Sequence, residues 1–230
     1  MVTAGPTREK IDDVRDWGNI FSGKTGLDLA LALLSLGSVT LLTSNVDHAR
    51  EFDGYTGAGG MMGVETFRTH ADLQALLAER MTSGDPVNVV AMTAAVADYR
   101  PAGVYSVLQK SELRDGRETW TVQHVGGGSG KVGSDHDQIA ILGARTAKIV
   151  DMFRRDWHYQ GILIKFKLQV GMTDEELLKI GEKSRVASDA NLMVANTLAM
   201  ARPGNAGDPG GAFLLDGTAP RRVPRANLAG

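Results

Sequence analysis

Short apolar segments alternate with segments of helical spacing in the N-terminal half of the chain, and this alternation is the strongest constraint on its fold. The run VNVVAMTAAV at 87–96 is apolar almost throughout, as expected for a parallel strand buried on both faces. Strands separated by helices are typical of an α/β fold with a doubly wound, mostly parallel sheet. We expect strands at 2–4, 39–43, 64–67 and 87–96, helices at 24–36 and 71–81, and irregular segments at 5–23 and 45–63.

The C-terminal half continues this pattern after an insertion. Two short strands joined by the turn sequence RDGR predict a hairpin arm, and the glycine-rich HVGGGSGKVGSD predicts a mobile loop. Since we find no internal repeat and no linker, we expect a single domain over residues 1–230, with the arm at about 104–125 and a flap at about 126–136. The predicted elements are strands at 105–109, 119–125, 161–168 and 192–196, helices at 139–157 and 174–188, and a closing hairpin of 213–216 with 221–223.

Composition excludes several functional classes. The 230 residues include no cysteine, so disulfides, thiolate nucleophiles and cysteine metal sites are excluded. A net charge of −2 argues against sequence-independent binding to nucleic acid. No apolar run approaches the roughly 18 residues of a membrane span, and MVTAGPTREK lacks the apolar core of a secretory signal, so we expect a cytoplasmic protein. VTA at the start and ANLAG at the end look like elements cut short, so we expect clipped termini.

The segment GNIFSGKT, residues 18–25, matches the phosphate-binding P-loop pattern G-x-x-x-x-G-K-[ST]. A P-loop follows directly on a buried strand, but the residues before Gly18 are the charged EKIDDVRDW, and the nearest predicted strand ends at Ala4. A P-loop NTPase is therefore the alternative and not the main interpretation. The G-x-G-x-x-G fingerprint of Rossmann dehydrogenases is also missing after the first strand.

Three stretches, AGPT, SGKTG and TAAVAD, are predicted to meet at the carboxyl edge of the sheet, where open α/β sheets bind ligands. Ser22, Gly23 and Gly26 stand at the beginning of a predicted helix, and free backbone N–H groups at such a position favour phosphate. For Ser22 an ordinary N-cap is an equal alternative.

Taken together, these stretches resemble the phosphopantothenoylcysteine synthetase (phosphopantothenate–cysteine ligase) family. VTAGPT at 2–7 reproduces the family's V-T-A-G-[GP]-T, and DDVRDWGNIFSGKTG stands in place of its acidic V-R stretch and N-x-S-S-G. The matches continue in the expected order over nearly the whole chain, with AAVADY at 94–99, ILIKFKLQV at 162–170 and VAN at 194–196.

This resemblance implies a Rossmann-like fold, a homodimer formed through the hairpin arm, and a ligase of coenzyme A biosynthesis. Such a ligase joins 4′-phosphopantothenate to cysteine through an acyl-nucleotidylate, using CTP or ATP with Mg²⁺ and releasing pyrophosphate. Nothing in the chain matches the flavin-dependent decarboxylase that is fused to many members, so we expect no flavin. Because Phe21 replaces a serine of the motif, a non-catalytic nucleotide-binding relative is a further alternative.

The resemblance also assigns roles to individual residues. Asn19 matches the asparagine that holds the substrate carboxylate and the intermediate, and Arg15 matches the arginine of the V-R stretch. Lys131 is the candidate for the flap lysine that neutralises developing charge, with Lys110 as its rival. Asp98 matches an aspartate near the nucleotide that is suited to Mg²⁺. The remaining nucleotide-binding candidates are Gly5, Ser22, Gly23, Gly26, Ala94, Ala95, Phe166, Lys183 and Asn196.

Several of these residues have a simpler interpretation. Asn19 is also a common turn residue, and Phe166 is nearly as well explained by core packing. For Lys183 a solvated helix face is the better-supported reading. His70, His124, His136 and His158 do not show ligand spacing, so we expect no zinc site.

Overall fold

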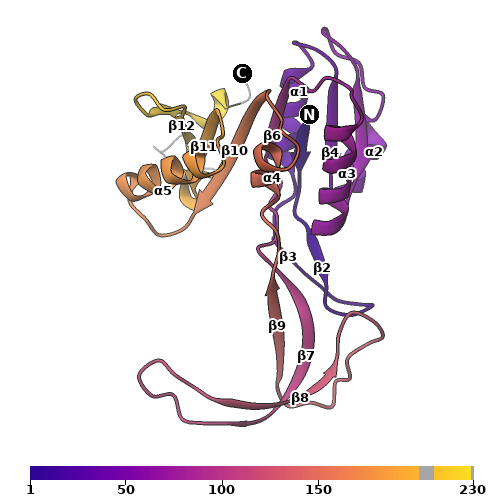
Figure 1. The fold of residues 1–230 in the computed structure, drawn as a ribbon, viewed down its shortest axis with the longest axis vertical. Coiled ribbons are helices and arrows are strands. Elements are labelled where there is room, and N and C mark those ends of the chain that lie inside the picture. Colours follow the sequence, from indigo (N-terminus) through magenta and orange to yellow (C-terminus); the bar gives the residue numbers. More distant parts are fainter. Residues whose placement is uncertain (202–209, 229–230) are drawn as a thin grey trace.

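A large, mostly parallel sheet forms the centre of the molecule (Figure 1). The computed structural model of the chain describes residues 1–201 and 210–228. Within them, eight strands lie in the order β13-β12-β11-β10-β6-β1-β4-β5. The six neighbouring strands β11, β10, β6, β1, β4 and β5 pair in parallel. At the end of the sheet, β12 pairs antiparallel with β11 and with β13. The strands are β1 (Val2–Ala4), β4 (Val39–Thr43), β5 (Met62–Thr66), β6 (Val89–Met92), β10 (Ile162–Gln169), β11 (Leu192–Thr197), β12 (Ala212–Leu215) and β13 (Arg221–Val223).

Helices cover both faces of this sheet, as a doubly wound fold requires. Neighbouring residues of a strand point to opposite faces, so Leu41 packs in the same cluster as Ala30 of α1, whereas Leu42 packs in the cluster of Leu73 and Phe153. One face is covered by α1 (Lys24–Leu33) and α2 (Val46–Phe52), and the other by α3 (His70–Thr82), α4 (Ile149–Arg155) and α5 (Asp174–Ala187); α6 (Leu198–Ala201) and the 3-10 turn Arg225–Asn227 follow β11 and β13. The fold class expected from the sequence is confirmed.

Local sequence fixes where the longer helices begin. Thr69 and Asp72 form a reciprocal capping box at the start of α3, and Thr173 and Glu176 do the same for α5. Each pair satisfies two backbone N–H groups that the first turn leaves free. These capping boxes anchor the helices that cover the face opposite α1.

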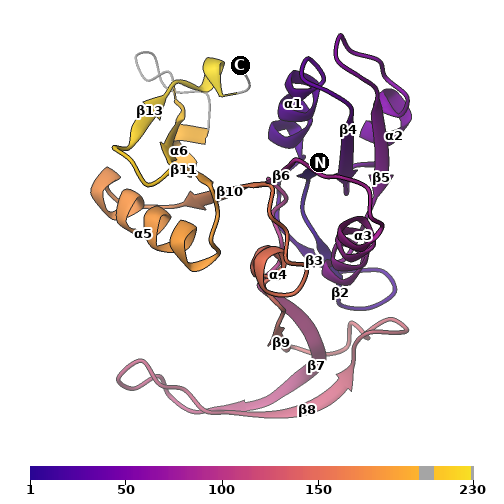
Figure 2. The same ribbon diagram turned by 45° about the horizontal axis from the view of Figure 1, so that its top comes forward.

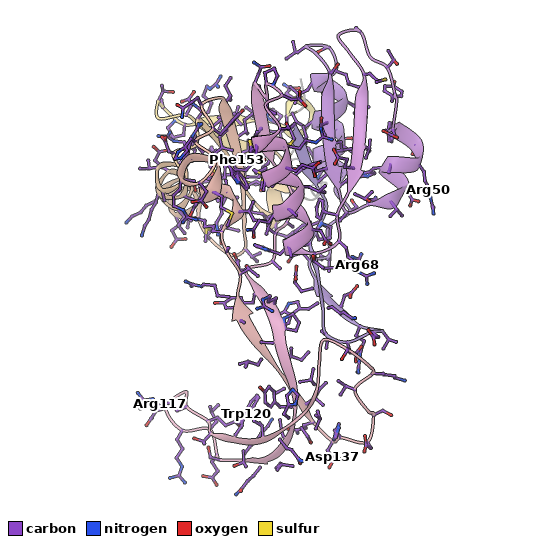
Figure 3. All side chains as sticks on the ribbon, turned by 45° about the vertical axis from the view of Figure 1, so that its right-hand side comes forward. Arg50, Arg68, Arg117, Trp120, Asp137 and Phe153 are labelled. Carbon is purple, nitrogen blue, oxygen red and sulfur yellow. The ribbon has the colours of Figure 1, made fainter. Side chains whose placement is uncertain are left out.

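An arm of three antiparallel strands projects from the sheet. β7 (Tyr99–Lys110) pairs with β8 (Trp120–Gly126) on one side and with β9 (Ile139–Arg145) on the other. A small hairpin of β2 (Arg8–Lys10) and β3 (Asp16–Gly18) lies at the base of the arm beside β7. Figure 2 shows the arm extending away from the helices, and Figure 3 places Arg117 and Trp120 far from Phe153 in the helix layer.

Several local expectations are wrong. The helix expected at 139–157 begins only at Ile149, because residues 139–145 form β9, whose hydrogen bonds to β7 override local preference. The segment 45–63, expected to be irregular, contains α2, which Asn45 caps. The loop expected at 5–23 contains the β2–β3 hairpin, and the strand expected at 87–96 ends at Met92. In the part of the chain that the structure describes, no helix is long and apolar enough to cross a membrane.

Candidate active site

The carboxyl ends of β1 and β6 lie side by side at the point where the strand order reverses, which is the usual ligand site of such sheets. Hydrogen bonds fasten the two segments that follow these strands. The Ala94 N–H donates to Thr3 Oγ1 at 3.1 Å, and the Ala97 N–H donates to Thr7 Oγ1 at 2.9 Å. The Ala95 N–H donates to the Gly5 carbonyl at 3.0 Å. The expected meeting of AGPT with TAAVAD at this edge is therefore observed.

The glycine turn at the beginning of α1 packs directly on the end of β1. Gly23 has a φ of 84°, and a Cβ atom there would lie 2.7 Å from the backbone nitrogen of Gly5. A Cβ at Gly26 would lie 2.7 Å from the Cβ of Ala4. The N-cap residue Gly23 has no side chain to cap α1, and Ser22 Oγ accepts from the Lys24 N–H at 3.4 Å. The glycines thus hold a helix N-terminus against the strand edge, which is favourable for an anion.

This turn does not have the surroundings of a P-loop. The strand before it, β3, belongs to the hairpin at the base of the arm and not to the central sheet. Lys24 Nζ pairs with Asp28 Oδ1 one helical turn further on, at 2.8 Å, and its side chain is largely exposed. The turn therefore reproduces the letters of the pattern without the strand that it needs.

Two residues that the sequence analysis did not single out support the glycine turn. Asn45 Nδ2 donates to the Ser22 carbonyl at 3.3 Å and also contacts His48 Nε2 at 3.2 Å. His48 Nδ1 lies 3.0 Å from Thr43 Oγ1, so the ring is held at both nitrogens. Burial lowers the pKa of His48, which favours a neutral imidazole in this chain of hydrogen bonds.

Two adjoining cavities open at this edge. One of about 440 Å³ lies against the glycine turn, and one of about 720 Å³ lies toward α4 and α5. Each is large enough for a small-molecule ligand. They share a wall formed by Phe21, Ala94, Ala95, Phe166, Lys167 and Leu168.

Most of the residues singled out from the sequence line these cavities. The larger one is lined by Asn19 and Asp98, and Asn19 Nδ2 donates to the Ala95 carbonyl at 3.2 Å. The smaller cavity is lined by Gly5, Ser22, Gly23, Gly26 and Asn196, and both are lined by Ala94, Ala95 and Phe166. The described residues include no cluster of three or more side chains suited to hold a metal ion. Asp98, as a single carboxylate, suits Mg²⁺ only together with ligand oxygens.

Three of the sequence candidates lie elsewhere. Among the described residues, Arg15, Lys131 and Lys183 line neither cavity. Lys183 is exposed on α5, next to Ser184, which does line the larger cavity. Lys110, the rival of Lys131, lies on the arm with its ammonium 4.6 Å from the centre of the Trp120 ring.

The loop that carries Lys131 is tied down by a buried carboxylate. Asp12 Oδ2 accepts from the Val132 N–H at 3.1 Å and from Arg15 Nη2 at 2.5 Å, and Arg15 Nη2 also donates to the Val132 carbonyl at 3.0 Å. The guanidinium of Arg15 holds the pKa of Asp12 well below its usual range. Asp13 exchanges hydrogen bonds with Gly130, at 2.8 Å and 2.5 Å. Lys131 is thus exposed on a loop fixed at both of its neighbours.

A group of cations in the larger cavity was missed at the level of sequence. Its wall carries Arg145, Lys148, Lys165 and Lys167, and Asp98 is the carboxylate among its lining residues. Lys165 is only 6% exposed, and burial together with nearby Lys148 lowers its pKa to about 8. The available signal was the interruption of an apolar strand by lysines at alternate positions in ILIKFKLQ.

The sheet order, the switch point and the cavities define a Rossmann-like α/β protein with a ligand site at the carboxyl edge. Residues 1–124 match the family model described as "DNA/pantothenate metabolism flavoprotein C-terminal domain", and the chain belongs to this family.

Curated relatives include the Coenzyme A biosynthesis bifunctional protein CoaBC of Thermococcus kodakarensis, which is 28% identical over 198 residues, covering 86% of this chain and 41% of the relative. The CoaBC of Bacillus subtilis is 34% identical over 122 residues, covering 52% of this chain and 27% of the relative. The chain thus spans less than half the length of these relatives.

Solved structures agree on the fold. The DNA/pantothenate metabolism flavoprotein from Streptococcus pneumoniae has a TM-score of 0.71 at 25% identity, covering 97% of this chain and 90% of that chain. A Cab2 mutant in complex with phosphopantothenate-cysteine has a TM-score of 0.64 at 15% identity, covering 98% of this chain and 80% of that chain, a likeness that supports the fold alone.

Proposed function

We propose that this chain is the phosphopantothenate–cysteine ligase of coenzyme A biosynthesis. The observation that carries the proposal is the pair of adjoining cavities that joins a glycine turn to Asn19 and to the Ala94–Asp98 segment. The names of the relatives, which are coenzyme A biosynthesis proteins, support the same pathway.

The reaction proceeds in two steps. The carboxylate of 4′-phosphopantothenate attacks the α-phosphorus of CTP or ATP, which forms an acyl-nucleotidylate and releases pyrophosphate. The cysteine amine then attacks the acyl carbon, the nucleoside monophosphate leaves, and the amine loses a proton. With no cysteine in the chain, catalysis rests on positioning and on stabilising charge rather than on a thiolate nucleophile.

In this proposal the nucleotide binds in the smaller cavity and the acid substrate binds in the larger one. The glycine turn with Ser22, Gly23 and Gly26 receives nucleotide phosphates, and Phe166 and Asn196 line the space for the nucleoside. The Asn19 amide donates to the substrate carboxylate and to the oxyanion that develops from it. Asp98 holds Mg²⁺ together with phosphate oxygens.

The flap and the arm complete the proposal. We assign Lys131 to charge neutralisation, which requires its loop to leave Asp12 and Asp13 or to serve the site of a second subunit. Arg15 takes part with a phosphate once its pair with Asp12 opens. Exposed apolar side chains on the arm favour a homodimer, because such patches mark association surfaces; they are Leu108, Leu113, Trp120 and Leu142.

We further propose that the protein acts in the cytoplasm, without flavin, nucleic acid or membrane as a partner. A non-catalytic nucleotide-binding relative is the second candidate, since Phe21 lies in the wall between the two cavities where the motif has serine. The P-loop NTPase alternative is disfavoured by the position of β3 outside the central sheet.

Pyrophosphate release tests this function. We would supply 4′-phosphopantothenate with CTP or ATP, with and without cysteine, to the unaltered protein and to Asn19→Ala. Release that requires 4′-phosphopantothenate and falls at least about a hundredfold in Asn19→Ala is the expected result. Nucleotide binding without any pyrophosphate release supports the non-catalytic relative, and triphosphate cleavage without phosphopantothenate supports the NTPase.

A further inference from the structure

The larger cavity carries an excess of positive charge that the assigned residues do not use. Four cationic side chains and one carboxylate, Asp98, are among its lining residues. Of these cations, Lys148 has an ion pair among the described residues, with Asp151 Oδ2 at 3.4 Å. Arg145, Lys148 and Lys165 line this cavity and not the one against the glycine turn, whereas Lys167 lines both.

Lys165 is the least exposed of these cations, and its hydrogen-bond partners are neutral. It lies on β10 level with Met92 of β6, and both residues line the cavity. Its Nζ donates to the Ser184 carbonyl at 2.8 Å and to Ser188 Oγ at 2.5 Å, which leaves one of its three N–H groups free of these contacts. A buried lysine is ordinarily paired with a carboxylate.

The nearest carboxylate is shared. Ser188 Oγ donates to Asp151 Oδ1 at 2.6 Å, so the hydroxyl stands between Lys165 and Asp151. The other oxygen of Asp151 faces Lys148. The single carboxylate of Asp151 is thus shared between Lys148 and Lys165. Lys167 follows Lys165 by two residues on β10, so it lies on the same face of the strand, and it also lines the cavity.

We propose that Lys148, Lys165 and Lys167 form a binding site for a phosphoryl group in the larger cavity. Lys148 and Lys167, which are more exposed, contact the phosphoryl oxygens, and Lys165 supports them as a buried positive charge. A phosphate monoester carries up to two negative charges and offers several acceptor oxygens, so it balances the uncompensated charge of this wall. The proposal rests on the proposed function, since its ligand is a phosphorylated substrate of that reaction.

The geometry favours the acid substrate over the nucleotide as the source of this group. The N-terminus of α1 already offers a phosphate site in the smaller cavity. Asn19 lies in the same cavity as the lysines, so one ligand with a carboxylate at one end and a phosphate at the other contacts both. The phosphate of 4′-phosphopantothenate and the phosphates of the nucleotide share this chemistry, and direct binding separates them.

Calorimetric titration of the full chain tests the site. We would measure the Kd of 4′-phosphopantothenate, of pantothenate and of CTP and ATP for the unaltered protein, Lys148→Gln and Lys167→Gln. Lys179→Gln is the matched control, because it removes the same charge from an exposed position on α5 that does not line the cavity. Thermal unfolding verifies that each variant is folded.

We expect each cavity variant to raise the Kd of 4′-phosphopantothenate by about tenfold, with that of pantothenate unchanged and the control equal to the unaltered protein. A rise for CTP or ATP instead supports the phosphoryl site and assigns it to the nucleotide. Unchanged values for every phosphorylated ligand, or their failure to bind the unaltered protein, overturn the proposal.

A parallel assay of phosphopantothenoylcysteine formation separates this proposal from the proposed function. If product forms and the variants bind as the unaltered protein does, the phosphoryl site is wrong while the ligase stands. If the variants lose phosphate-dependent binding and no product forms in the unaltered protein, the site stands and the ligase fails.

Discussion

Gly23 offers the sharpest test of how the glycine turn is built. Its backbone is left-handed, with a φ of 84°, and a Cβ there would lie 2.7 Å from the nitrogen and 3.0 Å from the Cα of Gly5. Alanine in this conformation costs about 1–2 kcal/mol from its own backbone. Displacing a packed backbone costs about 1–3 kcal/mol more. We therefore expect Gly23→Ala to lower the free energy of unfolding by about 2–5 kcal/mol.

Gly84 supplies the matched control. Its φ is 85°, but a Cβ there would meet nothing within 4 Å, so Gly84→Ala carries the conformational cost alone, about 1–2 kcal/mol. Gly26→Ala is the complementary variant. It lacks the left-handed backbone, and its added Cβ would lie 2.7 Å from the Cβ of Ala4 and 2.4 Å from Thr93 Oγ1.

Urea unfolding of the three variants measures these free energies, and an unchanged slope verifies that the folded and unfolded states are comparable. Equal losses for Gly23→Ala and Gly84→Ala would refute the close packing of the turn on β1. If the turn also binds nucleotide phosphates, nucleotide affinity falls in Gly23→Ala and not in Gly84→Ala.

Three further predictions concern the buried Lys165 of the larger cavity, the flap at 126–136 and the arm. Because the pKa of Lys165 falls to about 8 in the folded protein from 10.5, the unfolded state binds more protons between these values, so stability rises with pH across that range by at most about 3 kcal/mol. Urea unfolding between about pH 8 and pH 10 will show a smaller rise in the free energy of unfolding for Lys165→Met than for the unaltered protein. The same dependence of stability on pH in both proteins would contradict this prediction. Asp12→Asn weakens the attachment of Val132, so limited proteolysis will cut residues 126–136 faster than in the matched Asp115→Asn variant on the arm; equal rates would mean that Asp12 does not hold the loop. If the arm forms a homodimer, Trp120→Lys yields monomer in sedimentation while Val170→Lys, on an exposed site after β10, does not.

The sequence was sufficient to predict the central sheet because its strands and helices follow local patterns. The apolar run around Val89–Met92 and the spacing of leucines in α1 are readable without tertiary information. The arm was only partly predictable. Residues 139–145 become a strand through hydrogen bonds to β7, more than thirty residues away in the chain, and no local signal reports such a partner.

The candidate site also contains residues whose positions could be predicted from the sequence and residues whose positions could not. The stretches AGPT and TAAVAD were expected to meet because both follow strands at the carboxyl edge of one sheet, and the hydrogen bond from the Ala95 N–H to the Gly5 carbonyl is observed. Asn19 was a candidate through the family resemblance, and its Nδ2 donates to the Ala95 carbonyl. The positions of Arg15 and Lys131 depend instead on Asp12, which attaches one loop to another. The lysines of the larger cavity were missed because Lys165 is buried against Ser184 of α5 and Ser188 at its C-terminal end. How α5 packs on the sheet is a property of the folded chain and not of the local sequence.

In the P-loop match, the glycines and the lysine of the pattern have different outcomes in the structure. GNIFSGKT still places glycines and free N–H groups at a helix N-terminus, and that geometry suits an anion whatever strand precedes it. The lysine of the pattern is different, because Lys24 pairs with Asp28 along its own helix. The cation that a P-loop brings with its own turn must therefore come from another element in this fold. Lys167 lines both cavities and Arg225 lines the one against the glycine turn, so these cations are already in place, whereas the loop of Lys131 carries a cation that would have to move.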